Sequence, residues 1–130
     1  MILALKTDNP MARVVLLTID GAIVAEREWH AHRTLAKDLP RVISELLQQL
    51  QQDWTAVEAV ILFRGPGSFT GLRIGAAVAN TIAYAQQIPV IGIECEDWLR
   101  QGIERLSAGE NDRLVLPAYG REANITQPKK

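Results

Sequence analysis

The sequence predicts one α/β domain, in which a mixed sheet opens with three antiparallel strands and continues through crossover helices. An Asp-Gly pair at Asp20-Gly21 separates two β-rich runs near the N-terminus. Further along the chain, continuous apolar runs of strand length alternate with runs whose apolar residues recur at helical spacing. The length of 130 residues fits one domain, and 48% apolar with 22% charged residues is an ordinary globular composition.

The three leading strands are predicted from turn signals and β-type composition. Ile2–Leu5 is a short β-type run, and the turn cluster Asp8-Asn9-Pro10 ends it. Val14–Ile19 and Ala22–Glu28 flank Asp20-Gly21, a dipeptide that strongly favours a hairpin turn. We therefore expect three sequential antiparallel strands at the start of the domain.

A helix and a buried strand follow the three strands. Apolar residues recur at helical spacing from Leu35 to Leu50. Pro40 lies early in this run, where the first turn of a helix tolerates proline. Val57–Phe63 is apolar throughout, which is typical of a parallel strand that is buried on both faces.

The remaining elements alternate between helix and strand. They are a helix over Thr70–Gln86, a short strand over Pro89–Ile93, a helix over Glu96–Leu106 and a last strand over Leu114–Tyr119. The resulting order, β-β-β-α-β-α-β-α-β, matches one half of an actin-like or ribonuclease-H-like fold. A Rossmann unit would not begin with three meandering strands. We expect the domain to span residues 1–125 and a polar tail to occupy residues 126–130.

Charge and cysteine content limit the possible binding partners and the cellular compartment of the protein. The net charge is −1, whereas a strongly electrostatic grip on nucleic acid needs a basic surplus. Cys95 is the only cysteine, so no intrachain disulfide is possible. No apolar run approaches the length that spans a bilayer. We expect a cytoplasmic protein without membrane contact.

The glycine-rich stretch Gly65–Gly75, GPGSFTGLRIG, lies between a predicted strand and a predicted helix. Such a loop either holds an anion on its N–H groups or lets another backbone approach closely. The stretch lacks the Gly-Lys-Ser/Thr of a Walker A loop and the spacing of Gly-x-Gly-x-x-Gly. Turn and cap chemistry, with Ser68 or Thr70 as the N-cap, is therefore favoured over phosphate binding. The candidate phosphate contacts are Gly65, Gly67, Ser68, Thr70 and Arg73.

The helix after this loop carries a ridge of small residues. Gly71, Gly75, Ala79 and Ala83 stand four residues apart and share one face. Each interior glycine costs roughly 1 kcal/mol relative to alanine, which indicates close approach of another element. The opposite side is also apolar, so the helix is expected to be buried on more than one side. The sheet covers one side, and either the first helix or a partner chain covers the other.

No catalytic residue and no metal ligand is assigned. His30 and His32 lack the additional ligands that a zinc site requires. Cys95 has no adjacent histidine and is interpreted as a structural thiol. Ser68 does not lie in a Gly-x-Ser-x-Gly elbow.

The stretch Gly65–Gly75 resembles the hallmark motif of the TsaB (YeaZ) family. Ile2–Leu5 resembles the first strand of that family, and Leu39-Pro40 with Leu46-Leu47 resembles its first helix. Ile88–Ile93 resembles the segment that follows the motif. The resemblance covers nearly the whole chain and implies an actin-like (ASKHA) fold.

The resemblance also implies a function and partners. Members of this family are non-catalytic subunits in the synthesis of threonylcarbamoyladenosine on tRNA, and they work with a TsaD-type catalytic subunit and a TsaE-type ATPase. The pairing surface is built from the first two helices. We therefore expect no intrinsic cofactor, ATP or ADP only where it is shared at the partner interface, indirect contact with tRNA, and a homodimer without the partner. The expected interface residues are Leu39, Val42, Ile43, Leu46, Gly71, Leu72, Gly75, Ala76, Ala79 and Ala83.

Two departures from the family pattern stand out. The first strand of the family usually runs into Asp-Thr-Ser, whereas this chain has Lys6-Thr7-Asp8. This difference argues further against a catalytic role. Typical members continue with a second, smaller half that this sequence does not include. Two alternatives stay open: a nucleotide- or phosphate-binding protein that uses the Gly65–Gly75 loop, and a self-associating interaction module with no tRNA role.

Overall fold

The N-terminal segment folds into an antiparallel meander. In the computed structural model, which describes residues 1–119 apart from the His32 side chain, β1 (Ile2–Lys6) pairs with β2 (Met11–Leu17), and β2 pairs with β3 (Ile23–His30). The turn between β2 and β3 contains Asp20-Gly21, and Gly21 has a φ of +97° that favours glycine. The predicted hairpin is confirmed, with longer strands than the sequence indicated.

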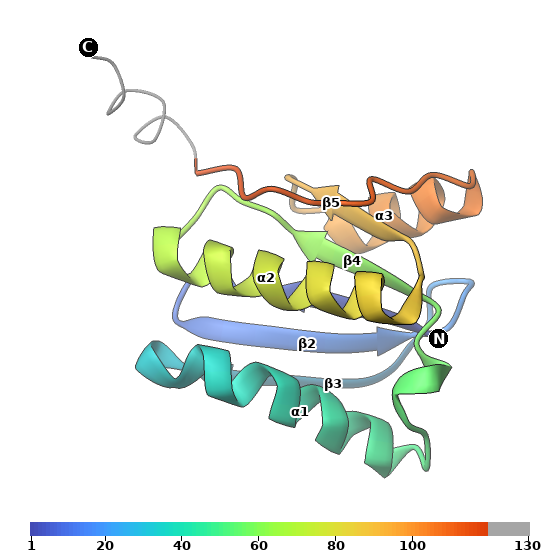
Figure 1. Cartoon of the computed structure of the whole chain (residues 1–130), viewed down its shortest axis with the longest axis horizontal. Helices are drawn as coiled ribbons and strands as arrows, with labels where there is room; N and C mark the ends of the chain where they lie inside the picture. The colour runs from blue at the N-terminus through green and yellow to red at the C-terminus, as the bar shows by residue number, and fades with distance from the viewer. Residues whose placement is uncertain (120–130) are drawn as a thin grey trace.

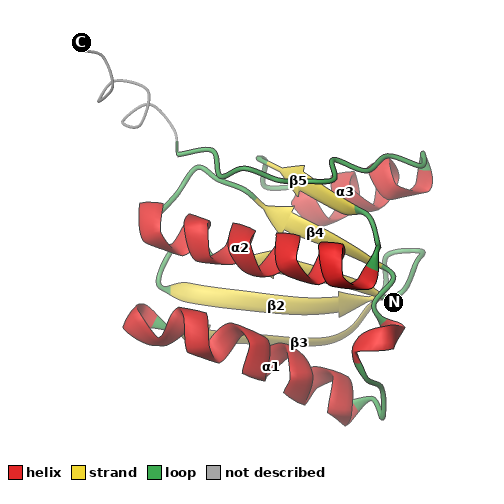
Figure 2. Cartoon of the chain, viewed as in Figure 1, coloured by secondary structure: helices red, strands yellow, loops and turns green. Residues whose placement is uncertain are grey.

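Two parallel strands complete the sheet. β4 (Ala59–Phe63) lies parallel to β1 on one side and to β5 (Val90–Ile93) on the other, which gives the strand order β3-β2-β1-β4-β5. Every residue of β4 is buried, because helices cover both faces of the sheet at this position (Figure 2). The continuous apolar run predicted this burial correctly.

The helices form a layer on each face of the sheet. α1 (Leu35–Gln49) and α2 (Phe69–Gln86) lie side by side on one face, and α3 (Trp98–Ser107) covers the other (Figure 1). Short 3-10 turns, His32–Thr34 and Trp54–Ala56, lead into α1 and into the segment before β4. This is the mixed α/β architecture with crossover helices that the sequence predicts.

The sheet divides the core into two apolar clusters. Alternation along β1 sends Leu3 and Leu5 toward α1 and α2, and Ile2 and Ala4 toward α3. Trp98, at the start of α3, packs edge-on against Phe63 at a centroid distance of 6.1 Å. No helix in the described part of the chain is long and apolar enough to cross a membrane.

The predicted last strand over Leu114–Tyr119 is wrong. These residues make no ladder pairing with the sheet. The Asn80 amide of α2 donates to Val115 O and accepts from Val115 N, each at 2.9 Å, so the groups that a neighbouring strand would use are already bonded. The predicted polar tail, 126–130, and the predicted domain end at 125 lie outside the described residues.

The position of Pro40 within its helix also differs from the prediction. Because α1 begins at Leu35, Pro40 lies beyond the first turn, where its missing N–H leaves Ala36 O without the usual helical donor. Its side chain is exposed, so its ring faces solvent and not the core.

Candidate functional site

The glycine motif is fastened to the end of β1 by Thr7 and Asp8. Thr7 is fully buried, and its Oγ1 donates to Gly71 O at 2.8 Å. The Ser68 N–H donates to Asp8 O at 2.7 Å. The first turn of α2 is therefore held against the carboxyl end of β1.

Close packing against Thr7 explains the glycines of α2. A Cβ at Gly71 would lie 2.3 Å from Thr7 O, and a Cβ at Gly75 would lie 2.2 Å from Thr7 Oγ1. A Cβ at Gly67 would meet Asp8 in the same way, at 2.5 Å. These distances support the second of the two uses weighed for the motif, because the missing side chains let Thr7 and Asp8 approach closely.

Ser68 is the N-cap of α2. Its Oγ accepts a long hydrogen bond of 3.4 Å from Gly71 N, which satisfies one of the free N–H groups at the helix start. Thr70, the other predicted candidate for the cap, lies inside the helix and is exposed. The helix thus begins one residue before the predicted start.

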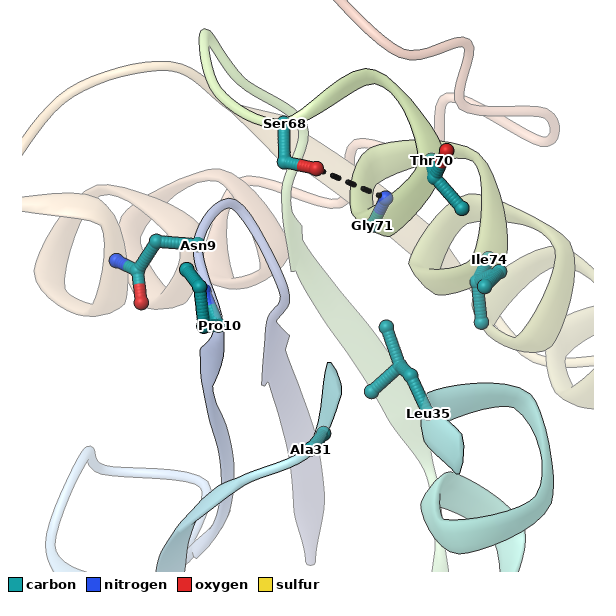
Figure 3. Close-up of a pocket in the computed structure, with 8 residues that line it drawn as sticks. All are labelled: Asn9, Pro10, Ala31, Leu35, Ser68, Thr70, Gly71 and Ile74. Carbon is teal, nitrogen blue, oxygen red and sulfur yellow. Dashed lines mark hydrogen bonds between the residues drawn. The ribbon is translucent and has the colours of Figure 1, made fainter. Parts of the chain in front are cut away.

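A pocket of about 200 Å³ opens beside this cap. Figure 3 shows the segments that line it: Asn9 and Pro10 from the β1–β2 turn, Ala31 and Leu35 around the start of α1, and the first two turns of α2. Leu35 and Ile74 form its apolar side, and Ser68 with Thr70 form its polar side. Segments far apart in the sequence therefore meet at the N-terminus of α2.

The structure brings together only some of the predicted phosphate contacts. Ser68 and Thr70 line the pocket, but Gly65, Gly67 and Arg73 do not. The Arg73 guanidinium instead lies over the Phe69 ring, 5.4 Å from its centroid. The lining contains no charged side chain, so it offers backbone N–H groups and hydroxyls but no cation to an anion.

Lys6 is neutralised within the chain. Its Nζ lies 2.7 Å from Asp8 Oδ1 and 4.6 Å from the centroid of the Phe63 ring. The position where the resembling family has aspartate thus carries a cation that is already paired. Among residues 1–119, no group of three or more His, Cys, Asp or Glu side chains could hold a metal ion.

The ridge of small residues faces inward. Gly71 and Gly75 contact Thr7, while Ala79 and Ala83 are buried in the apolar cluster between the helices and the sheet. The sheet of the same chain therefore covers this ridge, although its residues are among the expected interface residues. Of the ten expected interface residues, Gly71 is half-buried and nine are buried: Leu39, Val42, Ile43, Leu46, Leu72, Gly75, Ala76, Ala79 and Ala83.

A different stripe of α2 faces solvent. It consists of five exposed residues that follow helical spacing, which we call the outer stripe: Thr70, Arg73, Ala77, Thr81 and Tyr84. Beside it, a groove of about 340 Å³ runs between the two helices, and its lining is almost entirely apolar. The groove is lined by Pro40, Trp54, Ala77, Val78, Thr81 and Ile82.

A charged network joins α1 to β3. The Thr34 hydroxyl donates to Asp38 at 2.6 Å, and this bond, followed by those from Arg41 and Trp29, holds the pKa of Asp38 below its ordinary value. Hydrogen bonds from Arg27 and then from Arg41 likewise lower the pKa of Glu45. These contacts leave the outer face of α1 with paired charges.

Sequence reasoning missed two residues that organise this region. Thr7 gave no signal, because a single threonine after a strand predicts no particular contact. Asn80 did give a signal, since it is one of few polar residues in an otherwise apolar helix. Its long-range bonds to Val115 account for that polarity.

Comparison with known proteins places these features in a family context. Residues 23–125 match the family model described as TsaD, tRNA N6-adenosine threonylcarbamoyltransferase. The chain is 34% identical over 126 residues to the tRNA threonylcarbamoyladenosine biosynthesis protein TsaB of Haemophilus influenzae, which covers 97% of this chain and 52% of the relative. It is 33% identical to the Escherichia coli protein of the same description, covering 95% of this chain and 56% of the relative.

The fold is shared with a solved structure. YeaZ from Pseudomonas aeruginosa superposes with a TM-score of 0.66 at 31% identity, over 82% of this chain and 49% of that protein. The chain spans about half the length of the curated relatives that it matches.

Proposed function

Because the chain belongs to the TsaB (YeaZ) family, we propose that it is a non-catalytic subunit in the synthesis of threonylcarbamoyladenosine on tRNA. In this proposal it pairs with a TsaD-type catalytic chain through α1 and α2, and the TsaE-type ATPase joins the resulting pair. It reaches tRNA only through that partner, since its net charge is −1. The observation that carries the proposal is the exposed apolar groove between the two helices.

The outer stripe and the groove fit the role of a pairing surface. Ala77 is the smallest side chain in the middle of the stripe, so a partner helix can approach α2 closely there. Val78 and Trp54 offer apolar area on either side of the groove, while Arg73 and Tyr84 provide a polar and aromatic border. This surface replaces the inward-facing ridge as the part of α2 that contacts the partner.

The non-catalytic role is supported by the chemistry of the glycine motif. Thr7 and Asp8 occupy the space beside Gly67, Gly71 and Gly75, and Lys6 is paired with Asp8. The adjacent pocket has no charged lining. We therefore propose that the chain has no cofactor of its own and that any ATP or ADP is shared with the partner.

Pairing is tested with the full chain and its cognate TsaD-type protein. Ala77→Arg places a long cation on the outer stripe without touching the core, and we expect it to weaken the heterodimer at least about ten-fold by calorimetry. Ala108→Arg, at an exposed alanine after α3, is the matched control and should bind like the wild type. Equal affinity of the two variants would contradict pairing through α2.

The rival function is phosphate binding by the isolated chain. The N-terminus of α2, with Ser68 and Thr70 beside the pocket, is the observation in its favour. Calorimetry of the isolated chain with ATP and magnesium should show no binding under the subunit proposal. Tight binding that is lost in the Ser68→Ala/Thr70→Ala double variant would favour the rival.

A further inference from the structure

We propose that residues 111–118 form a displaceable strap over the free edge of β5, clamped by Asn80 and able to open as one unit. The strap was predicted in part as a strand, yet it forms no ladder. It is instead attached mainly through side chains that bond to backbone groups. This inference does not depend on the proposed function.

β5 is an edge strand whose outward backbone groups need partners. β5 ends the strand order, with β4 as its neighbour. Pro89 and Ile93 turn their carbonyl oxygens toward the β4 side, where backbone N–H groups bond to them. Val90 and Gly92 therefore turn their N–H and C=O groups outward. An uncovered edge of this kind is a template for another strand.

The start of the strap caps these groups. Asn111 Oδ1 accepts from Val90 N at 3.1 Å, and Asp112 Oδ2 accepts from Gly92 N at 2.8 Å. Asp112 N donates to Val90 O at 2.9 Å. The fourth group, Gly92 O, accepts from Arg105 Nη1 at 3.1 Å, and the same guanidinium pairs with Asp112. All four outward groups are thus bonded without a neighbouring strand.

The middle of the strap is clamped by α2. Asn80 holds both the N–H and the C=O of Val115, at 2.9 Å each, across a sequence separation of 35 residues. Val115 is also the one buried side chain between positions 111 and 118. A Cβ at Gly92 would lie 2.5 Å from Val115 Cγ1, so the glycine in β5 leaves room for this anchor.

The strap can separate from the core because polar contacts, and not apolar packing, hold most of it in place. Leu114 and Leu116, on either side of the anchor, are each 61% exposed, so the strap buries little apolar area. Most of its attachment consists of hydrogen bonds near the surface. Segments with few buried apolar contacts and exposed hydrogen bonds open locally, at lower free energy than the whole domain.

Opening of the strap would also expose Gly65, the first residue of the glycine motif. Ala118 N donates to Arg64 O at 2.7 Å, and Arg64 Nε donates to Leu116 O at 2.8 Å. Gly65 has a φ of +132°, and a Cβ there would lie 2.0 Å from Ala118 O. The first residue of the motif is therefore packed under the end of the strap.

Amide exchange followed by NMR on the full chain tests this inference. In the wild type, the amides of Asp112, Val115 and Ala118 should exchange at least about ten-fold faster than those of β1 and β4. The outward amides of β5 should exchange at the same rate as the strap amides, because one opening exposes both. Asn80→Ala removes two hydrogen bonds and should speed exchange of the strap amides about ten-fold further. Gln86→Ala, which removes an amide side chain from the same helix, is the matched control.

Two results would overturn the strap. One is exchange of its amides at the rate of β1 and β4 in the wild type, which would mean that it opens only on global unfolding. The other is equal exchange in Asn80→Ala and Gln86→Ala. Because the first comparison uses the unmodified chain, the test holds even where Asn80→Ala fails to fold.

Discussion

At the scale of single residues, Thr7 determines how the glycine motif is used. Its hydroxyl is buried and bonded to Gly71 O, and its backbone and side chain fill the space that a Cβ on α2 would need. A buried hydroxyl without a partner would be costly, so Thr7 and the glycines depend on each other. The motif is therefore a packing device between β1 and α2.

Substitutions at Gly71 and Gly75 should distinguish crowding by the Thr7 side chain from crowding by the Thr7 backbone. Gly75→Ala meets the Thr7 hydroxyl and Gly71→Ala meets the Thr7 carbonyl, so each should lower the free energy of unfolding by about 1–3 kcal/mol. Adding Thr7→Ala removes Oγ1 and should recover part of the loss in Gly75→Ala, but not in Gly71→Ala.

Urea denaturation of the single and double variants measures this coupling. The Gly71→Ala pair serves as the control, because Thr7→Ala does not remove the carbonyl oxygen that a Cβ at Gly71 would meet. Additive losses for Thr7 and Gly75 would show that the hydroxyl does not set the space available to α2.

At the scale of elements, α1 is held by different forces on its two sides. Its inner face packs apolar residues onto the sheet, as the helical spacing predicted. Its β3 side carries the network of Asp38, Arg41 and Glu45, which bonds to Arg27 and Trp29 of β3. The orientation of α1 beside the groove therefore depends in part on ionised carboxylates.

This network predicts how stability depends on pH. The pKa values of Asp38 and Glu45 are lowered in the folded chain, so their contribution is present above their unfolded values of about 4 and is lost as pH falls below them. The double variant Asp38→Asn/Glu45→Gln should be less stable than wild type at pH 7 and should lose less stability on acidification.

Denaturation midpoints between neutral and acidic pH provide the measurement. Glu96→Gln, at an exposed carboxylate outside the network, is the control and should follow the wild-type profile. If the double variant lost as much stability as wild type over the acidic range, the network would not be the source of the dependence.

At the scale of the whole molecule, the three-layer arrangement of the described residues leaves the groove between α1 and α2 open to solvent. The sheet covers the ridge of α2, and α1 covers one of its sides, but the outer stripe and the groove stay exposed. The proposed pairing with a partner chain rests on this exposed surface. In the isolated protein, a second copy of the chain offers the same surface.

We therefore expect the isolated chain to form an isologous dimer through α1 and α2. Sedimentation velocity over a range of concentrations should show a monomer–dimer equilibrium, and Ala77→Arg should weaken it at least about ten-fold. Ala108→Arg should leave it unchanged. A chain that stays monomeric at every concentration would rule out this mode of self-association.

Much of the fold was readable from local patterns. The Asp20-Gly21 turn, the apolar run of β4 and the cap at Ser68, one of two candidates, each depend on neighbouring residues, so strands and helices were placed within a few positions. The prediction of a last strand failed because the conformation around Val115 depends on hydrogen bonds to Asn80, which lies 35 residues away in sequence. Local patterns carry no information about such a contact.

The sequence by itself determined the α/β class, the order of the elements from β1 to α3 and the position of the glycine motif, because these follow from the spacing of apolar and turn residues along the chain. Only the tertiary structure decided which face of α2 turns inward, since a ridge of small residues fits a sheet and a partner helix equally well. Gly71 and Gly75 pack closely against Thr7, which turns the ridge toward the sheet. Ala77 and its neighbours therefore face solvent.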